Sequence, residues 1–201
     1  GDFALVEIYK NFGVETVFNY NNSITVSKIN TKFQKSLNFN LQSSPDIAQT
    51  IAVTCFGLGI SCHLTGLHTL KIKETDRLEA LKIELTKLGA AISVTNVSLT
   101  LEQSENIHPN VRISTYQDHR MAMAFAPLAL KVPIIIENAE VVSKSYPTFW
   151  EDLAAFNFSV VKEIHEKLSP QSSSEIFFFL KIVISLNLVY YILMQLFFYF
   201  R

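Results

Sequence analysis

Residues 71–77 read Lys-Ile-Lys-Glu-Thr-Asp-Arg and lead into a segment whose leucines recur every three or four positions. These leucines are Leu78, Leu81, Leu85 and Leu88. Because residues three and four apart share one face of a helix, the spacing predicts an amphipathic helix from Glu74 to Leu88. Gly89 follows it and suits the left-handed position that commonly ends a helix.

Five of the seven residues in 71–77 are charged, and two interpretations fit them. In the first, the segment is a solvated first turn in which Thr75 or Asp76 helps to cap the helix. In the second, Lys73 and Arg77 lie four positions apart, share a helix face and converge on one anion. Composition alone favours the first interpretation.

Strand-like and helix-like segments alternate on both sides of this helix. Hairpins are predicted at residues 14–28 and 91–101, short strands at 61–65 and 132–137, and further helices at 45–53, 118–131 and 147–156. Helix, strand, helix and paired strands therefore form a unit that recurs. This order indicates an α/β (α+β) fold class with an internal repeat.

The other predicted helices also begin beside ionisable residues. Ser44 can cap the helix that opens at Pro45, which leaves Asp46 at an exposed helix start. Asp118 is expected to cap the next helix, where Arg120 adds its guanidinium to a helix N-terminus, an arrangement that favours a phosphate or a carboxylate. Lys144 precedes a third helix start.

A structural histidine at His119 and a solvated loop lysine at Lys144 are the simpler interpretations of those two residues. Several basic helix starts in one repeated domain can nevertheless face a common cleft. Arg77, Arg120 and Lys144 would then supply cations, and Asp46 or Glu74 would supply acid–base groups, for a ligand that carries both phosphate and carboxylate.

Composition limits the class of protein. The chain has 201 residues, 49 % of them hydrophobic, which suffices for one ordinary globular domain. Its formal net charge of −1 gives no global attraction to nucleic acid or to an anionic membrane. Cys55 and Cys62 lie in an apolar stretch without the spacing of a metal site or a secreted disulfide framework, so we expect buried reduced thiols.

The last quarter of the chain differs in composition. We predict a domain over residues 1–160, a polar linker at 161–175 and a hydrophobic tail at 176–201, where Phe, Ile, Leu, Val and Tyr dominate. The tail is long enough for a transmembrane helix, which needs about 20 apolar residues. Translation of a shifted or non-coding stretch would produce the same bias, so both interpretations stay open, and a membrane partner follows only if the tail is native.

Four motifs together carry a family resemblance. Residues 71–78, 116–123, 143–147 and 44–46 resemble, in order and spacing, the motifs of the 5-enolpyruvylshikimate-3-phosphate synthases of the shikimate pathway. The resemblance covers roughly residues 3–157. It implies half of a two-domain enzyme, each domain having three βαβαββ units, that moves the enolpyruvyl group of phosphoenolpyruvate to the 5-hydroxyl of shikimate 3-phosphate and releases phosphate. It also implies a cytoplasmic enzyme with no metal and no organic cofactor.

The resemblance implies a role for each matched residue. Asp46 would be the base that takes the hydroxyl proton, and Lys73 would hold that hydroxyl and Asp46. Glu74 and Lys144 are alternative donors of the proton to the methylene carbon, with Lys144 beside the phosphate. The matched arginines, Arg77 and Arg120, would bind the carboxylate of phosphoenolpyruvate.

The resemblance is partial, and this leaves alternatives. The N-terminal domain that completes both substrate sites has no counterpart in the chain, so the chain alone is expected to be inactive unless a second chain supplies that half. A non-catalytic, membrane-anchored anion-binding domain is an alternative function. The sister enzyme acting on UDP-N-acetylglucosamine is another, although that enzyme lacks the Lys-Glu-Thr-Asp-Arg segment.

Overall fold

The computed structural model describes residues 3–21, 23–29, 34–73, 75–156, 158–165 and 175–180 of the chain. Its central part is one complete βαβαββ unit. The elements of this unit are β3 (Ser36–Asn40), α2 (Ala48–Leu58), β4 (Ser61–Thr65), α3 (Arg77–Lys87), β5 (Ile92–Val94) and β6 (Ser98–Leu101). The strands form one sheet in the order β3-β4-β6-β5, in which β3 and β4 are parallel and the other pairs are antiparallel. Because α2 crosses back over the sheet between β3 and β4, these two strands can run in the same direction.

A second unit repeats the same order. It consists of β7 (Val111–Ile113), α4 (His119–Phe125), β8 (Ile134–Ile136), α5 (Phe149–Ala155), β9 (Val160–His165) and β10 (Glu175–Leu180). Its sheet has the order β7-β8-β10-β9, again with a parallel first pair and antiparallel pairs after it. The recurrence of helix, strand and helix that the sequence predicted is confirmed. The second pair of strands and the common strand order of the two sheets were not predicted.

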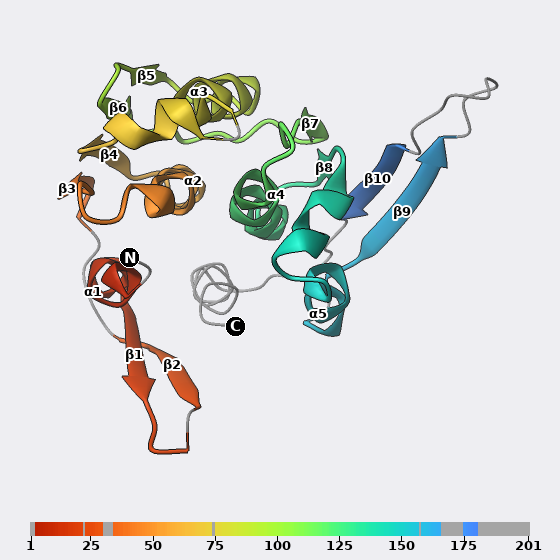
Figure 1. Cartoon of the computed structure of the whole chain (residues 1–201), viewed down its shortest axis with the longest axis horizontal. Helices are drawn as coiled ribbons and strands as arrows, with labels where there is room; N and C mark the ends of the chain where they lie inside the picture. Colours follow the sequence, from red (N-terminus) through yellow and green to blue (C-terminus); the bar gives the residue numbers. More distant parts are fainter. Residues whose placement is uncertain are drawn as a thin grey trace.

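The chain before these units contains one helix and one hairpin. Helix α1 (Ala4–Lys10) precedes β1 (Val14–Phe18) and β2 (Ile24–Lys28), which pair antiparallel in a two-stranded sheet. The Tyr9 hydroxyl lies 2.8 Å from Thr54 Oγ1 in the buried interior, so α1 is joined to α2. Figure 1 shows the hairpin extending away from the helices of the central unit.

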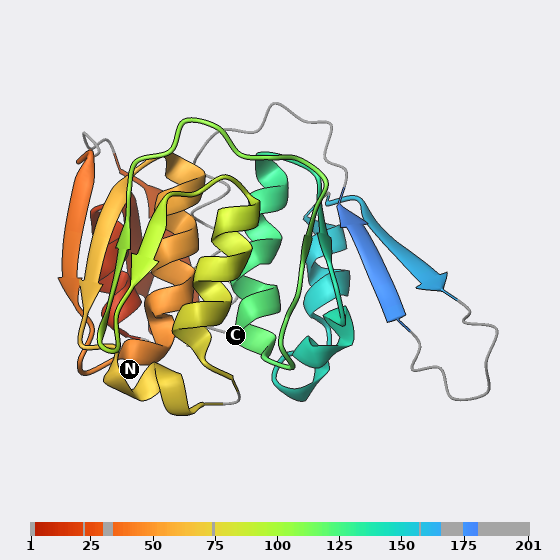
Figure 2. The same ribbon diagram turned by 90° about the horizontal axis from the view of Figure 1, so that it is seen from above.

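The helices stand between the two four-stranded sheets. Figure 2 shows α2, α3 and α4 side by side and roughly parallel, with the first sheet on one side and the second sheet on the other. Short 3-10 turns precede or follow several of the helices, namely η1 (Pro45–Ile47), η2 (His68–Ile72), η3 (Ala126–Leu130) and η4 (Ala139–Lys144). The same view shows that α2, α3 and α4 all begin at one edge of the layer. Their N-termini therefore lie close together, although they are far apart in the sequence.

Helix α3 illustrates how the sequence produces these elements. Asp76 is its N-cap, and the Asp76 side chain accepts a hydrogen bond from the backbone N–H of Glu79, as capping residues do. The predicted apolar face is confirmed, because all four leucines from Leu78 to Leu88 are fully buried. Gly89 follows with φ +100°, a left-handed conformation that costs glycine little. The helix begins at Arg77 instead of Glu74.

Two predictions about local structure, at Ser44 and at the end of α4, are wrong, and the prediction for the two cysteines is confirmed. The Ser44 side chain forms no capping hydrogen bond, and Pro45 opens a 3-10 turn before α2 begins at Ala48. The helix predicted to reach Lys131 ends at Phe125, because Pro127 has no N–H to donate and a 3-10 turn follows. Cys55 and Cys62 are buried free thiols, as expected. Burial, followed by a hydrogen bond and a charge interaction with Cys62, raises the pKa of Cys55.

The predicted limits of the domain, linker and tail remain predictions, since most of residues 161–201 lies outside the described part. Within that part, however, β9 crosses the limit at residue 160 and β10 crosses the limit at 175, so neither segment is linker or helix there. Both segments are rich in β-branched and aromatic residues, which favour strands, and they complete the second sheet. No helix of the described residues is long and apolar enough to cross a membrane.

Candidate active site

The shared edge of the helix layer carries a cluster of charged side chains. Asp46 comes from η1 before α2, Lys73 from the turn before α3, Arg77 from the first position of α3, and Arg120 from the first turn of α4. Hydrogen bonds and ion pairs join all four of them. The structure thus brings together four of the six residues that the sequence predicted for the site.

At the centre of the cluster is a buried ion pair between Arg77 and Asp118. Arg77 Nε donates to Asp118 Oδ2 at 2.6 Å, and Arg77 Nη2 reaches Asp118 Oδ1 at 3.4 Å. The Asp118 side chain is fully buried, and the Arg77 side chain is only 3 % exposed. Two hydrogen bonds between one guanidinium and one buried carboxylate fix the guanidinium in position and orientation.

The carboxylate of Asp118 also organises the start of α4. As the N-cap of that helix, Asp118 accepts a hydrogen bond from the backbone N–H of Arg120 at 2.9 Å. A further bond comes from Gln49 Nε2 on α2 at 3.3 Å. The expectation that Asp118 caps the helix is confirmed. Its second function, which is to hold Arg77 and to join α2, α3 and α4, was not predicted.

Asp46 lies on the solvent side of this buried pair. Arg77 Nη1 donates to Asp46 Oδ1 at 2.8 Å, and Lys73 Nζ lies 3.4 Å from the same oxygen. Arg120 Nη1 donates to the backbone oxygen of Asp46 at 3.3 Å. The Asp46 and Lys73 side chains are 35 % and 34 % exposed, so solvent and a ligand can reach both.

This arrangement suits proton transfer next to an anion. An ionised carboxylate beside a lysine and an arginine can accept a proton from a hydroxyl that the lysine positions. The guanidinium groups of Arg77 and Arg120 both donate to Asp46, and guanidinium binds planar anions through paired hydrogen bonds. Helix N-termini at the same edge add partial positive charge.

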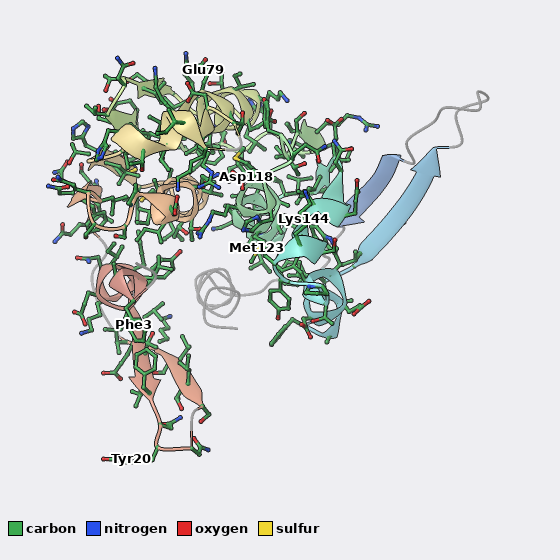
Figure 3. The ribbon with its side chains drawn as sticks, in the orientation of Figure 1. Phe3, Tyr20, Glu79, Asp118, Met123 and Lys144 are labelled. Carbon is green, nitrogen blue, oxygen red and sulfur yellow. The ribbon has the colours of Figure 1, made fainter. Side chains whose placement is uncertain are left out.

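The sequence also predicted Glu74 and Lys144 as site residues. Glu74 lies outside the described residues. Lys144 is exposed at the end of η4, and within the described residues no hydrogen bond or ion pair joins it to Asp46, Lys73, Arg77 or Arg120. Figure 3 marks Lys144 on η4 and Asp118 at the start of α4. Among the described residues no group of three or more His, Cys, Asp or Glu side chains could hold a metal ion.

Sequence reasoning also missed Gln49 and Glu84, which are both buried polar residues on predicted helices. Gln49 bonds Asp118, and Glu84 bonds Ser114 and Tyr116 in the segment that leads to Asp118. The available signal was position, since both residues fall on the buried face of an amphipathic pattern where a polar residue needs a partner. The partners themselves lie between β7 and α4, in a distant part of the chain, and could not be read from spacing.

Comparison with known proteins agrees with the fold and the motifs. The EPSP synthase family model, described as 3-phosphoshikimate 1-carboxyvinyltransferase, matches residues 1–153. The chain is 42 % identical over 163 residues to a 3-phosphoshikimate 1-carboxyvinyltransferase of Bacteroides fragilis, covering 80 % of this chain and 39 % of the relative. It is 32 % identical over 152 residues to the protein of the same name from Neisseria meningitidis serogroup B, covering 75 % of this chain and 35 % of the relative.

A solved structure shows the same fold. The EPSP synthase from Acinetobacter baumannii superposes with a TM-score of 0.62 at 23 % sequence identity, over 75 % of this chain and 38 % of that one. The chain thus spans between a third and two fifths of the length of these relatives. Since the family model matches from residue 1 to residue 153 and the site motifs fall within that range, the chain belongs to the EPSP synthase family.

Proposed function

We propose that this chain forms one wall of an active site that transfers the enolpyruvyl group of phosphoenolpyruvate to the 5-hydroxyl of shikimate 3-phosphate and releases phosphate. One observation carries the proposal: Asp46, half-exposed, is held by Lys73 and Arg77 with Arg120 beside it. Membership of the EPSP synthase family supports the reaction, and it disfavours the sister reaction on UDP-N-acetylglucosamine.

In the proposed mechanism Asp46 accepts the proton of the 5-hydroxyl while the oxygen of that hydroxyl attacks phosphoenolpyruvate. Lys73, whose ammonium already lies 3.4 Å from Asp46, holds both the hydroxyl and the carboxylate. Protonation of the methylene carbon completes the tetrahedral intermediate. This intermediate then loses a proton from the new methyl group and expels phosphate, so that the enolpyruvyl double bond forms again. Glu74 and Lys144 remain the alternative donors of the proton to the methylene carbon.

Arg77 and Arg120 bind the carboxylate of phosphoenolpyruvate in this proposal. Because Arg77 Nη1 donates to Asp46, a substrate carboxylate at Arg77 would take the place of the Asp46 carboxylate there. Asp118 would keep the guanidinium oriented through Nε during the exchange. Binding of phosphoenolpyruvate would thereby release Asp46 to act as a base, next to Lys73.

The test is a chimera that supplies the rest of the enzyme. Residues 1–153 of this chain replace the matching part of the Bacteroides fragilis relative, and phosphate release is measured with phosphoenolpyruvate and shikimate 3-phosphate. We expect turnover that requires both substrates, with the intact relative as the positive control, and no turnover by the 201-residue chain alone. A folded chimera that releases no phosphate would contradict the proposal.

Replacing Arg120 with Lys in that chimera is expected to raise the KM for phosphoenolpyruvate about tenfold, with little change in kcat. Lysine keeps the charge but loses the paired hydrogen bonds, and one hydrogen bond to a charged group is worth about 1.5 kcal/mol or more. Steady-state kinetics measures both parameters. Arg112→Lys is the matched control, because Arg112 is exposed on β7 and pairs with Glu137 at 3.8 Å. An unchanged KM in Arg120→Lys would remove Arg120 from the binding site.

A further inference from the structure

Helix α3 contacts the segment before α4 at two points. Arg77, at the start of α3, binds Asp118. Glu84 lies seven positions later on the same face of the helix, about 10 Å along its axis, and binds Ser114 and Tyr116. The segment 114–118 is therefore fixed to α3 at its beginning and at its end.

The contacts of Glu84 account for both carboxylate oxygens of a fully buried side chain. Oε2 accepts the backbone N–H of Ser114 at 3.2 Å, and Oε1 accepts the Tyr116 hydroxyl at 2.7 Å. Lys87 Nζ lies 2.8 Å from each oxygen and compensates the charge. Burial, followed by the hydrogen bond to Glu84 and the charges of Glu84, Glu137 and Glu79, raises the pKa of Tyr116. The phenol therefore stays a hydrogen-bond donor.

The backbone of the segment needs such restraint. Tyr116 and Gln117 have φ angles of +54° and +60°, so two consecutive non-glycine residues adopt the left-handed conformation. Such conformations persist only where the surrounding structure enforces them. Within the segment, the Asp118 N–H donates to the Thr115 carbonyl at 2.9 Å, and the remaining described side-chain contacts to α3 are those of Glu84 and Arg77.

This strained turn sets the direction from which the chain enters α4. It puts the Asp118 carboxylate onto Arg77 and, two residues later, puts Arg120 against the backbone oxygen of Asp46. A turn that relaxed to right-handed angles would rotate Asp118 and Arg120 away from these partners. The geometry of the anion site thus depends on Glu84, which binds the turn at Ser114 and Tyr116 and not the site itself.

We propose that Glu84 is a positioning residue of the anion site, and that it acts by holding segment 114–118 in the left-handed turn that places Asp118 and Arg120. This inference rests on the proposed function for its effect on substrate binding. Its effect on the turn is independent of any activity.

The first measurement is amide hydrogen exchange on the 201-residue chain. Glu84→Gln keeps the shape of the side chain but loses its charge, and Tyr116→Phe removes only the hydroxyl. In both variants we expect the Arg120 amide, which donates to Asp118, to lose protection by about tenfold or more as the turn opens locally. Glu7→Gln is the matched carboxylate-to-amide control, because Glu7 pairs with Lys10 at the exposed surface of α1, and it should leave protection unchanged.

The second measurement is kinetic and uses the chimera. Glu84→Gln and Tyr116→Phe should raise the KM for phosphoenolpyruvate about tenfold, with kcat changed much less, since one charged hydrogen bond corresponds to about that factor. A purely stabilising role would lower the unfolding temperature of both variants and leave KM unchanged. If Glu84→Gln does not fold, Tyr116→Phe decides the question alone.

The outcomes separate the two proposals. Unchanged Arg120 protection together with an unchanged KM in folded Tyr116→Phe would overturn the role of Glu84. A chimera without turnover would contradict the proposed function, while the exchange measurement would still report on the turn.

Discussion

Replacing Asp118 with Ala is expected to lower the free energy of unfolding by about 3–5 kcal/mol, the typical cost of breaking a buried ion pair by removing one partner. The substitution leaves Arg77, whose side chain is 3 % exposed, with an uncompensated charge in the interior on the Asp118 side. It also removes the acceptor for Gln49 and the cap of α4. Urea unfolding of the 201-residue chain, followed by circular dichroism, measures the change.

The matched control for Asp118→Ala is Glu7→Ala on α1. Glu7 pairs with Lys10 at 2.8 Å, but both side chains are largely exposed, at 72 % and 48 %. Exposed pairs of this kind contribute about 0–1 kcal/mol, so the control should change stability little. If Asp118→Ala cost no more than Glu7→Ala, the pair with Arg77 would not be the centre of the cluster.

Replacing Asp46 with Ala in the chimera is expected to lower kcat by about 10² or more, because positioned proton transfer typically contributes at least that factor. Asp46 is half-exposed, and Arg77 keeps Asp118 as a partner when Asp46 is removed, so the fold should survive. Phosphate release at saturating substrates measures kcat. A base that acts only in the chemical step should affect KM much less than kcat.

Asp46→Asn distinguishes loss of the base from loss of shape. The amide keeps the size of the side chain and an oxygen for Lys73, but it cannot take a proton, so kcat should fall as far as in Asp46→Ala. Glu79→Gln is the matched inert carboxylate-to-amide change on α3. Normal turnover by Asp46→Asn would reject Asp46 as the base and would favour a different proton acceptor near the cluster.

The repeated unit connects the fold with the site. In each complete unit the two helices cover a sheet of the same strand order, and the helices begin at corresponding ends. Two such units place the starts of α2, α3 and α4 at one edge, where each contributes charged side chains. The repetition itself thus brings several helix N-termini, which carry partial positive charge, to one edge.

The described strands β9 and β10 also follow from this repeat. They occupy the positions that β5 and β6 occupy in the first unit, with the later strand of each pair next to the second parallel strand. Composition predicted a polar linker at 161–175 and a hydrophobic tail at 176–201 and did not predict these strands. In the structure, residues from beyond position 174 pair with the edge of β8. The sequence pattern could not show this, because strand formation there depends on the sheet with which the residues pair.

Local features of the chain were determined by the sequence itself. The buried leucine face of α3, the caps at Asp76 and Asp118, and the repeat of helices and strands follow from spacing and short-range hydrogen bonding, which a linear pattern records. The four motifs likewise identified the family, and they contain the four ionisable residues that the structure brings together. Pairings between distant residues were decided only by the tertiary structure. The pairs Asp118 with Arg77 and Glu84 with Tyr116 join residues 41 and 32 positions apart, and they depend on how α3 packs against the segment before α4. Burial makes these pairings strong, because an unpaired charge in the interior would be costly.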